Sequence, residues 1–262
     1  MAENKTEKWT EIEHLPEWDE EFYDVYTARK HGKWVMLKTL KPALLDNPRY
    51  REMIEKEFDV RYNLCHPNIV MINDFEDVPG VGMSIITDDV YGDSLRKLID
   101  KGEVSGAILD KIVCQLPEAI RYIQKNHILH HPIRPETIIF TENIRNLKLI
   151  DVGFDQREHL TPTDASEDIR NYGRVLRAAL DAYKPSGGKE EGDTLTQADL
   201  ARYAKVADRC LSDEPRRRFR DVQDLKMALA GDSNRRLYLT IITFLALMAL
   251  ILGWLCWKAP AL

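Results

Sequence analysis

The chain has 262 residues, enough for one large domain or two small ones, and 44% of them are hydrophobic, so a sizeable core is expected. The formal net charge is −6, which gives no reason to expect nucleic acid as a partner. The cysteines are far apart, lack CxxC spacing and stand among apolar neighbours, which argues against disulfides and zinc and predicts reduced, buried thiols in a reducing compartment. They are Cys65, Cys114, Cys210 and Cys256.

The first half of the chain has the patterns of β-strands. Residues 22–29 and 33–40 are rich in β-branched and aromatic residues and are separated by the turn sequence KHG, so we expect two antiparallel strands. A helical pattern covers residues 49–64, and two more short apolar runs follow at 70–77 and 82–89. This half therefore predicts a small sheet with one helix.

The second half is mostly helical. Isoleucine and leucine recur at three- and four-residue spacing over residues 105–125, which predicts an amphipathic helix that Pro117 should kink. Further helices are expected at 168–182, 198–211 and 220–229. A short strand pair is expected around "ILHHPIRPETIIF" and "LKLIDVGFD", and "YKPSGGKEEGDT" is typical of a loop.

The last part of the chain differs sharply from the rest. No charge appears over residues 237–257, and 21 helical residues at about 1.5 Å each span roughly the hydrocarbon thickness of a membrane. Arg235 and Arg236 precede this stretch and only Lys258 follows it, so the positive-inside rule places the preceding domain in the cytoplasm. The sequence predicts a single-pass, C-terminally anchored membrane protein that contacts the bilayer through 237–257.

A series of motifs follows in one order along the soluble part. These are "VMLK" at 35–38, "HPNIV" at 66–70, "IITDDVYGDSLRKLI" at 85–99, "HHPIRPET" at 130–137, "DVG" at 151–153, "DIRNYGRVL" at 168–176 and "CLSDEPRRRF" at 210–219. Their order and spacing resemble the serine/threonine type of the protein kinase superfamily over roughly residues 15–231. The resemblance implies an α+β, bilobal fold with a small β-rich N-lobe and a helical C-lobe.

The resemblance also implies domain boundaries. We expect an N-terminal extension at 1–14, a kinase-like domain at 15–231 (N-lobe about 15–88, C-lobe about 89–231), a basic juxtamembrane linker at 232–236, the transmembrane helix at 237–257 and a short tail at 258–262.

The resemblance assigns roles to individual residues. Lys38 would grip the α and β phosphates of ATP, Glu57 would pair with Lys38, and Asp151 would bind Mg²⁺. Thr87 would be the gatekeeper beside the adenine pocket, and the further nucleotide-binding positions would be Val25, Met36, Asp88, Val90 and Ile139. The structural positions of the C-lobe would be His130, Asp168 and Arg218.

Several residues depart from the family's catalytic pattern. Pro132 stands where the family has the catalytic base, and proline has no side-chain acceptor for a proton. Thr137 replaces the asparagine that holds a second Mg²⁺, and a hydroxyl is a weaker ligand. The segment 17–26 has no glycine and several acidic residues where a glycine-rich loop should cover the phosphates. Met36 is larger than the usual alanine, and Arg61 occupies a position that is usually apolar.

The segment between Asp151 and Asp168 is also short, about sixteen residues, and contains no APE motif. It leaves little platform for a peptide substrate, and Arg218 lacks its usual glutamate partner unless another acid supplies it. The sequence leaves open whether Thr161, Thr163 or Ser166 in this segment is phosphorylated by another kinase.

Two functional interpretations follow. The favoured one is a pseudokinase with no catalytic residue, which binds protein partners at the membrane. Lys38, Glu57 and Asp151 would then either bind ATP and Mg²⁺ weakly or persist as a structural ion pair and a turn aspartate. The alternative is an active, ATP-dependent serine/threonine kinase or a nucleotidyl transferase with rearranged chemistry.

Overall fold

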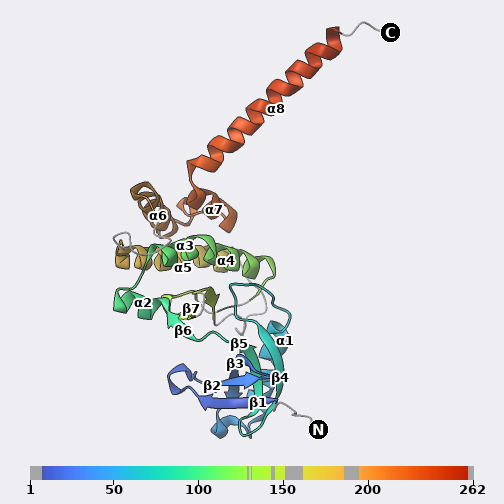
Figure 1. Cartoon of the computed structure of the whole chain (residues 1–262), viewed down its shortest axis with the longest axis vertical. Helices are drawn as coiled ribbons and strands as arrows, with labels where there is room; N and C mark the ends of the chain where they lie inside the picture. The colour runs from blue at the N-terminus through green and yellow to red at the C-terminus, as the bar shows by residue number, and fades with distance from the viewer. Residues whose placement is uncertain are drawn as a thin grey trace, which may run out of the picture.

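The computed structural model describes residues 8–128, 130, 132–142, 145–150, 162–185 and 195–258. Figure 1 shows three parts along its long axis: a sheet of the N-terminal strands with α1, a helical part, and the extended helix α8. The predicted loop at 183–194 is described only as far as residue 185. The arrangement is the bilobal fold expected from the motifs, with the sheet in the N-lobe and most helices in the C-lobe.

The N-lobe is a five-stranded antiparallel sheet in the order β1-β2-β3-β5-β4. The predicted pairing of two strands around KHG is confirmed, because β2 and β3 form a hairpin in register from Tyr23↔Leu40 to Lys30↔Lys33. Its two turn residues, His31 and Gly32, both have positive φ, which matches the right-handed twist of paired strands. The elements are β1 (Trp9–His14), β2 (Tyr23–Lys30), β3 (Lys33–Leu40), α1 (Pro48–Arg61), β4 (Ile72–Val78) and β5 (Gly82–Asp88).

The edge strand β1 was not expected from the sequence. It pairs with β2 in the register His14↔Tyr26, so the sheet begins at Trp9, inside the segment 1–14 that was predicted to be an extension. An edge strand needs to bury little, and no side chain of β1 is fully buried. Its sequence WTEIEH therefore carries only a weak apolar alternation.

The C-lobe has one large apolar core. The apolar face predicted for residues 105–125 is confirmed, because Ile108, Ile112, Ile120 and Ile123 are fully buried. Pro117 has a stronger effect than the predicted kink, since the helix breaks at Gln115 and restarts with the proline in its first turn. The helices are α2 (Leu95–Lys101), α3 (Gly106–Cys114), α4 (Leu116–Lys125), α5 (Pro162–Ala182), α6 (Gln197–Cys210) and α7 (Val222–Ala230).

A three-stranded sheet, β6-β7-β8, lies where the two lobes meet. The predicted strand pair of the second half is β7 and β8, and β6 adds to it from the segment that leaves the N-lobe. The strands are β6 (Gly92–Ser94), β7 (Ile138–Thr141) and β8 (Leu147–Leu149).

The cysteines are only partly as expected. Cys65, Cys114 and Cys210 are free thiols, but only Cys210 is buried, so the prediction of burial is wrong for the other two. Cys65 follows the end of α1, and Cys114 is the last residue of α3. At both positions the apolar residues that are neighbours in sequence face the core, whereas the cysteine itself is exposed. The side chain of Cys256 lies outside the described part.

The final helix, α8 (Asp232–Lys258), has 27 residues and includes the uncharged stretch 237–257. Every side chain from Tyr238 to Leu252 is exposed, and Figure 1 shows the helix extending away from α6 and α7. Within the described residues, no helix meets the combined length and hydropathy expected of a membrane span.

Candidate functional site

The space that the resemblance assigns to adenine is almost filled by side chains. Val25 of β2 and Met36 of β3 are buried together with Val70 and Val90, and Trp18 packs against this cluster. The cavity that remains has a volume of about 50 Å³. Cofactor and ligand sites commonly measure roughly 300–1,000 Å³, so this cavity has room for water but not for a purine ring.

Trp18 is brought to this position by residues 15–22, which we call the roof segment because it stands where a glycine-rich loop would cover the phosphates. Its start is a 3-10 helix, Pro16–Trp18, in which Trp18 N–H donates to Leu15 C=O at 2.9 Å. Proline favours the first turn of a helix because it needs no N–H there. Folded in this way, the roof segment places a large aromatic ring against the adenine position.

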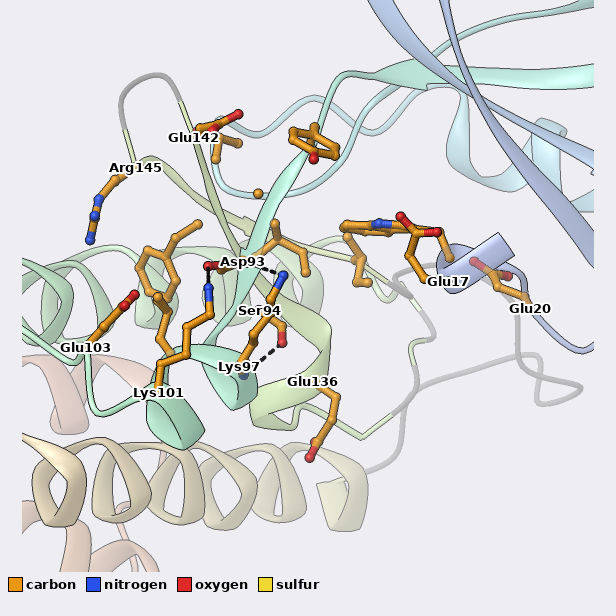
Figure 2. A pocket seen from close by; sticks show the side chains of 18 residues that line it. Glu17, Glu20, Asp93, Ser94, Lys97, Lys101, Glu103, Glu136, Glu142 and Arg145 are labelled. Carbon is orange, nitrogen blue, oxygen red and sulfur yellow. Dashed lines mark hydrogen bonds and ion pairs between the residues drawn. The ribbon is translucent and has the colours of Figure 1, made fainter. Parts of the chain in front are cut away.

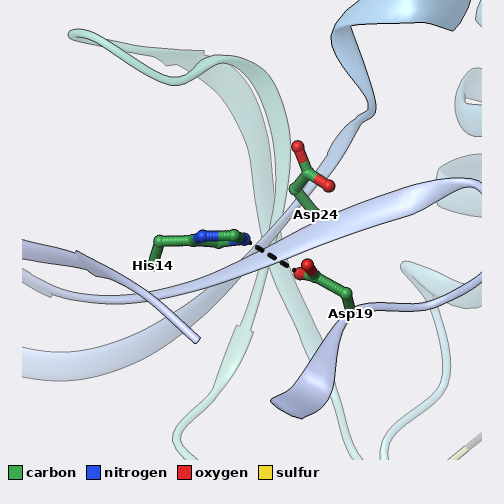
Figure 3. A group of neighbouring side chains, drawn as sticks. All are labelled: His14, Asp19 and Asp24. Carbon is green, nitrogen blue, oxygen red and sulfur yellow. Dashed lines mark hydrogen bonds and ion pairs between the residues drawn. The ribbon is translucent and has the colours of Figure 1, made fainter. Parts of the chain in front are cut away.

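One carboxylate ties the roof segment to both neighbouring strands. Asp19 Oδ1 accepts a hydrogen bond from Val25 N–H at 2.9 Å and lies 3.0 Å from His14 Nε2. Figure 3 shows His14 and Asp19 facing each other, with Asp24 beside them, and the ligand-type atoms of the three residues lie within 4.8 Å of one another. Because Asp19 already holds the backbone of β2, we interpret this group as a clamp on the roof segment.

Lys38 of β3 is bound by two carboxylates. Its Nζ lies 2.8 Å from Glu20 Oε2, in the roof segment, and 3.6 Å from Glu57 Oε1, on α1. The ammonium also lies 4.7 Å from the centre of the Tyr23 ring. Burial alone would lower the pKa of Lys38, but Glu57 and Glu20 outweigh it and raise the pKa above its usual value. Lys38 is therefore charged and fully paired.

Glu57 joins Lys38 to a second buried cation. It accepts hydrogen bonds from Tyr23 Oη at 2.8 Å and from Arg61 Nη1 at 2.5 Å, and its side chain is 8% exposed. Burial would raise the pKa of Glu57, but Lys38 and Arg61 lower it to about 2. Two cations and two carboxylates thus form a neutral cluster, which we call the Lys38 cluster: Glu20, Lys38, Glu57 and Arg61, with Tyr23 as a neutral donor.

Sequence reasoning found only part of this cluster. It expected the pair of Lys38 and Glu57, which the structure contains, although the role of this pair in holding a nucleotide stays a prediction. It noted Arg61 as unusual without giving it a partner. The contact of Glu20 with Lys38 was missed, and the surplus of acids in a segment without glycine is the one signal that pointed there.

ATP, which protein kinases use, does not fit the described arrangement of these side chains. Glu20 holds the ammonium that would bind phosphates, and Trp18 and Met36 occupy the adenine side. Asp151, the predicted Mg²⁺ ligand, lies outside the described residues.

In the loop that would carry out catalysis, the residue at the second metal-ligand position has its hydroxyl engaged within the loop. Thr137 is buried, and its hydroxyl accepts from Arg134 N–H and donates to Arg134 C=O, both at 3.1 Å. This hydroxyl therefore closes a turn of its own loop through two hydrogen bonds. Pro132 is exposed and offers no side-chain acceptor.

The predicted adenine-edge residues separate into two groups. Thr87 and Val90 line the 50 Å³ cavity together with Met36. Asp88 instead accepts from Asn73 at 3.2 Å and pairs with Lys148 Nζ at 3.3 Å. Ile139, on β7, is buried beneath a larger neighbouring cleft.

That cleft has a volume of about 770 Å³ and is dominated by carboxylates (Figure 2). Asp93 forms ion pairs of 2.7 Å with both Lys97 and Lys101, which leaves Arg145 as the other basic side chain in its lining. An acidic wall repels a nucleotide's phosphates. The carboxylates are Glu17, Glu20, Asp93, Glu103, Glu136 and Glu142.

The three residues predicted to be structural are all buried and bonded. His130 Nε2 lies 3.1 Å from Asp168 Oδ1, and Gln124 donates to the other carboxylate oxygen at 3.0 Å. Arg218 Nε donates to Ser212 C=O at 2.8 Å, and its Nη1 donates to Ser166 Oγ at 3.3 Å. These contacts connect the retained loop to α5 and to the turn after α6.

Comparisons with known proteins agree with the bilobal fold. The family model described as "Protein kinase domain" matches residues 21–170, more than half of the chain. The serine/threonine-protein kinase PknD of Mycobacterium tuberculosis is 30% identical over 213 residues, which are 78% of this chain and 29% of that protein. The serine/threonine-protein kinase PknG of Mycobacterium leprae is 27% identical over 241 residues, 79% of this chain and 31% of that protein. The chain thus spans less than a third of these relatives.

Among solved structures, the PknI kinase domain of Mycobacterium tuberculosis superposes with a TM-score of 0.57 at 21% identity, and the match covers 87% of this chain and 96% of that one. At this identity the likeness concerns the fold alone.

Proposed function

Because the chain belongs to the protein kinase domain family, we propose that it is a pseudokinase that keeps the fold, has lost phosphoryl transfer, and acts by binding other proteins at a membrane. The observation that carries this proposal is the contact of 2.8 Å between Glu20 and Lys38. In phosphoryl transfer a lysine of this kind stabilises phosphate charge. Here a carboxylate of the same chain holds it, beside a cavity of about 50 Å³.

A thermal-shift titration with ATP, with and without Mg²⁺, tests this proposal. A ligand at 100 times its Kd stabilises the folded state by about 2.7 kcal/mol, so even weak binding registers at millimolar nucleotide. We expect no shift for the native chain. The double variant Trp18→Ala/Glu20→Gln should gain one, because it frees Lys38 and enlarges the cavity. Glu17→Gln, one residue before Trp18 and without a contact to Lys38 among the described residues, is the matched control. A shift of the native chain at millimolar ATP contradicts the proposal.

A second candidate is an active serine/threonine kinase or nucleotidyl transferase, as in the alternative interpretation of the sequence. One observation favours it: Lys38 and Glu57 lie within ion-pair distance, as an active kinase requires. Incubation of the purified chain with radioactive ATP distinguishes the two candidates. Incorporation of phosphate or nucleotide that disappears in Lys38→Ala and in Asp151→Ala would establish the enzyme, and the pseudokinase predicts no incorporation.

The exposed apolar surface of α8 supports the proposed attachment to a membrane. Its side chains from Tyr238 to Leu252 are exposed and apolar except for two threonines, a surface that a lipid environment would cover. We propose that 237–257 spans the bilayer once and that the kinase-like domain is cytoplasmic. Extraction of membranes at alkaline pH should leave the native chain in the pellet. The variant Leu245→Asp/Leu250→Asp should move to the supernatant, since each aspartate at the centre of a span costs about 3 kcal/mol. A native chain found in the supernatant contradicts attachment.

A further inference from the structure

We propose that a groove between α6, α7 and α8 binds an anionic phospholipid, so that the domain rests on the membrane through this face of the C-lobe. The groove has a volume of about 1190 Å³. Figure 1 shows α8 leaving the C-lobe beside α6 and α7, at the opposite end of the long axis from the N-lobe sheet. The inference rests on the proposed span at 237–257 and goes beyond it by naming a ligand and a binding surface.

The groove is bounded by one face of each of the three helices. Its lining residues on α6 run from Ala198 to Lys205 in steps of three and four residues, and those on α7 run from Gln223 to Ala230 in the same way. This spacing places each set on a single face of its helix. The first turns of the uncharged stretch of α8 close the third side through residues that include Tyr238.

The charge of the lining is opposite to that of the whole chain. The chain has 43 acidic and 37 basic residues, yet the described lining contains Arg202, Lys205 and Lys226 and no carboxylate. Lys226 pairs with Glu118 of α4, which lies outside the groove. Arg202 and Lys205 therefore carry most of the positive charge that a bound anion would meet.

These two side chains differ in how they are held. Arg202 is fixed at the junction of α6 and α7, because its Nε donates to Leu229 C=O at 2.8 Å and its Nη2 pairs with Asp199. Lys205 is exposed and forms no ion pair within the described part of the chain. A lysine on a flexible stem is thus available beside an arginine whose position is already set.

The other walls of the groove are apolar and open to solvent. Met227 of α7 and Tyr238 and Ile242 of α8 line the groove, and each is more than half exposed. A group of exposed apolar side chains beside cations is typical of a surface that binds a membrane or another protein. A free anion would satisfy only the cations, whereas a phospholipid brings a phosphate for the basic wall and acyl chains for the apolar walls.

The position of the groove along α8 selects the lipid among these occupants. Tyr238 is the second residue of the uncharged stretch, and Ile242 lies one turn, or about 6 Å, further along. In a spanning helix this part lies at the cytoplasmic interface, where tyrosine is enriched. Anionic lipids gather on that side, and basic pockets between helices there bind their head groups. The groove therefore opens at the depth of the lipid phosphates.

The test titrates the full-length chain, in micelles of a neutral detergent, with phosphatidylglycerol and measures the retained lipid by native mass spectrometry. Phosphatidylcholine with the same acyl chains is the zwitterionic comparison. Each basic residue near an anionic lipid improves the affinity about fivefold, so two of them should make phosphatidylglycerol bind at least about tenfold more tightly. Millimolar inorganic phosphate, which has no acyl chain, should not displace it.

Two variants examine the two kinds of wall. Lys205→Gln should weaken the binding of phosphatidylglycerol about fivefold and leave that of phosphatidylcholine unchanged. Met227→Ser should weaken both lipids about threefold, because it removes apolar contact and no charge. Lys33→Gln is the matched control, since it removes the same charge from an exposed site in the N-lobe and should change neither affinity.

The inference is overturned by equal affinity for the two lipids, by displacement with inorganic phosphate, or by a Lys205→Gln chain that binds as Lys33→Gln does. Because the titration is done in micelles, its result is independent of the alkaline extraction that tests the span. A chain that stays in the pellet but binds both lipids equally overturns the lipid site alone. A chain that moves to the supernatant but keeps its preference for phosphatidylglycerol overturns the span and supports the site.

Discussion

Removing the charge of Glu57 should show how much the stability of the N-lobe depends on the Lys38 cluster. In Glu57→Gln the side chain keeps its size and an acceptor for Tyr23. However, Lys38 is left with only Glu20, and Arg61 loses the carboxylate 2.5 Å from its Nη1. The cluster then carries an uncompensated positive charge in a site where the Glu57 side chain is 8% exposed.

The pKa of Glu57 gives the magnitude of the expected loss of stability. It falls from 4.5 to about 2 on folding, a difference of roughly 2.5 pKa units. At 1.36 kcal/mol per unit this corresponds to about 3 kcal/mol at neutral pH. Breaking a buried ion pair by removing one partner commonly costs about 3–5 kcal/mol. We therefore expect Glu57→Gln to lower the free energy of unfolding by about 3 kcal/mol and Tm by roughly 6–12 °C.

Urea unfolding followed by tryptophan fluorescence measures this difference. Because the folded pKa is lowered, the stabilisation is complete above pH 4.5 and is lost as the pH falls toward 2. At pH 3 the gap between the native chain and Glu57→Gln should shrink to about half of its value at pH 7. Asp100→Asn removes half of the exposed pair with Arg96 and should change stability by less than about 1 kcal/mol. The reasoning would be refuted if Glu57→Gln lost no more free energy of unfolding at pH 7 than Asp100→Asn does.

Three further predictions concern the C-lobe and its junction with the N-lobe. Gly173→Ala would place a methyl group 2.4 Å from Cys210 Cβ between α5 and α6, so we expect a loss of about 1–3 kcal/mol in urea unfolding; an unchanged midpoint would contradict that packing. Asn68→Ala removes a buried amide that donates to Leu147 C=O at 3.0 Å. The same assay should show a loss of about 1–3 kcal/mol in the free energy of unfolding. An unchanged free energy would contradict this and would mean that water replaces the amide. Although Cys114 is exposed as a residue, partial covering of its thiol, together with Asp110, raises the pKa of the thiol to about 11. Its alkylation by iodoacetamide, followed by mass spectrometry, should therefore be slow at pH 8 and accelerate toward pH 11, and a rate that levels off near pH 9 would contradict this.

The C-lobe could be predicted well because its signals are local. Ile108, Ile112 and Ile120 repeat at helical spacing, and a periodic apolar face can be buried in only one way. The motif residues His130 and Asp168 were assigned to the framework from the resemblance, and the structure brings them within 3.1 Å of each other.

The state of the nucleotide site could not be predicted in the same way. The sequence indicated that acids in the roof segment would repel phosphate. It did not indicate that Glu20 would take the place of phosphate on Lys38 or that Trp18 would pack against the adenine position. Irregular segments have no periodicity, and the partner of a charged side chain in such a segment depends on tertiary geometry. The strand β1 was missed for a related reason, since an edge strand with little burial has little pattern.

The neutral Lys38 cluster has a consequence for how such a domain responds to the cell. In the proposed pseudokinase, a lysine that is already paired with carboxylates of its own chain would need no ligand to neutralise it, so the domain would present the same surface at high and at low cellular ATP. Its binding surface would then not change with the concentration of ATP. Control over its associations would then have to act on parts of the surface away from this cluster.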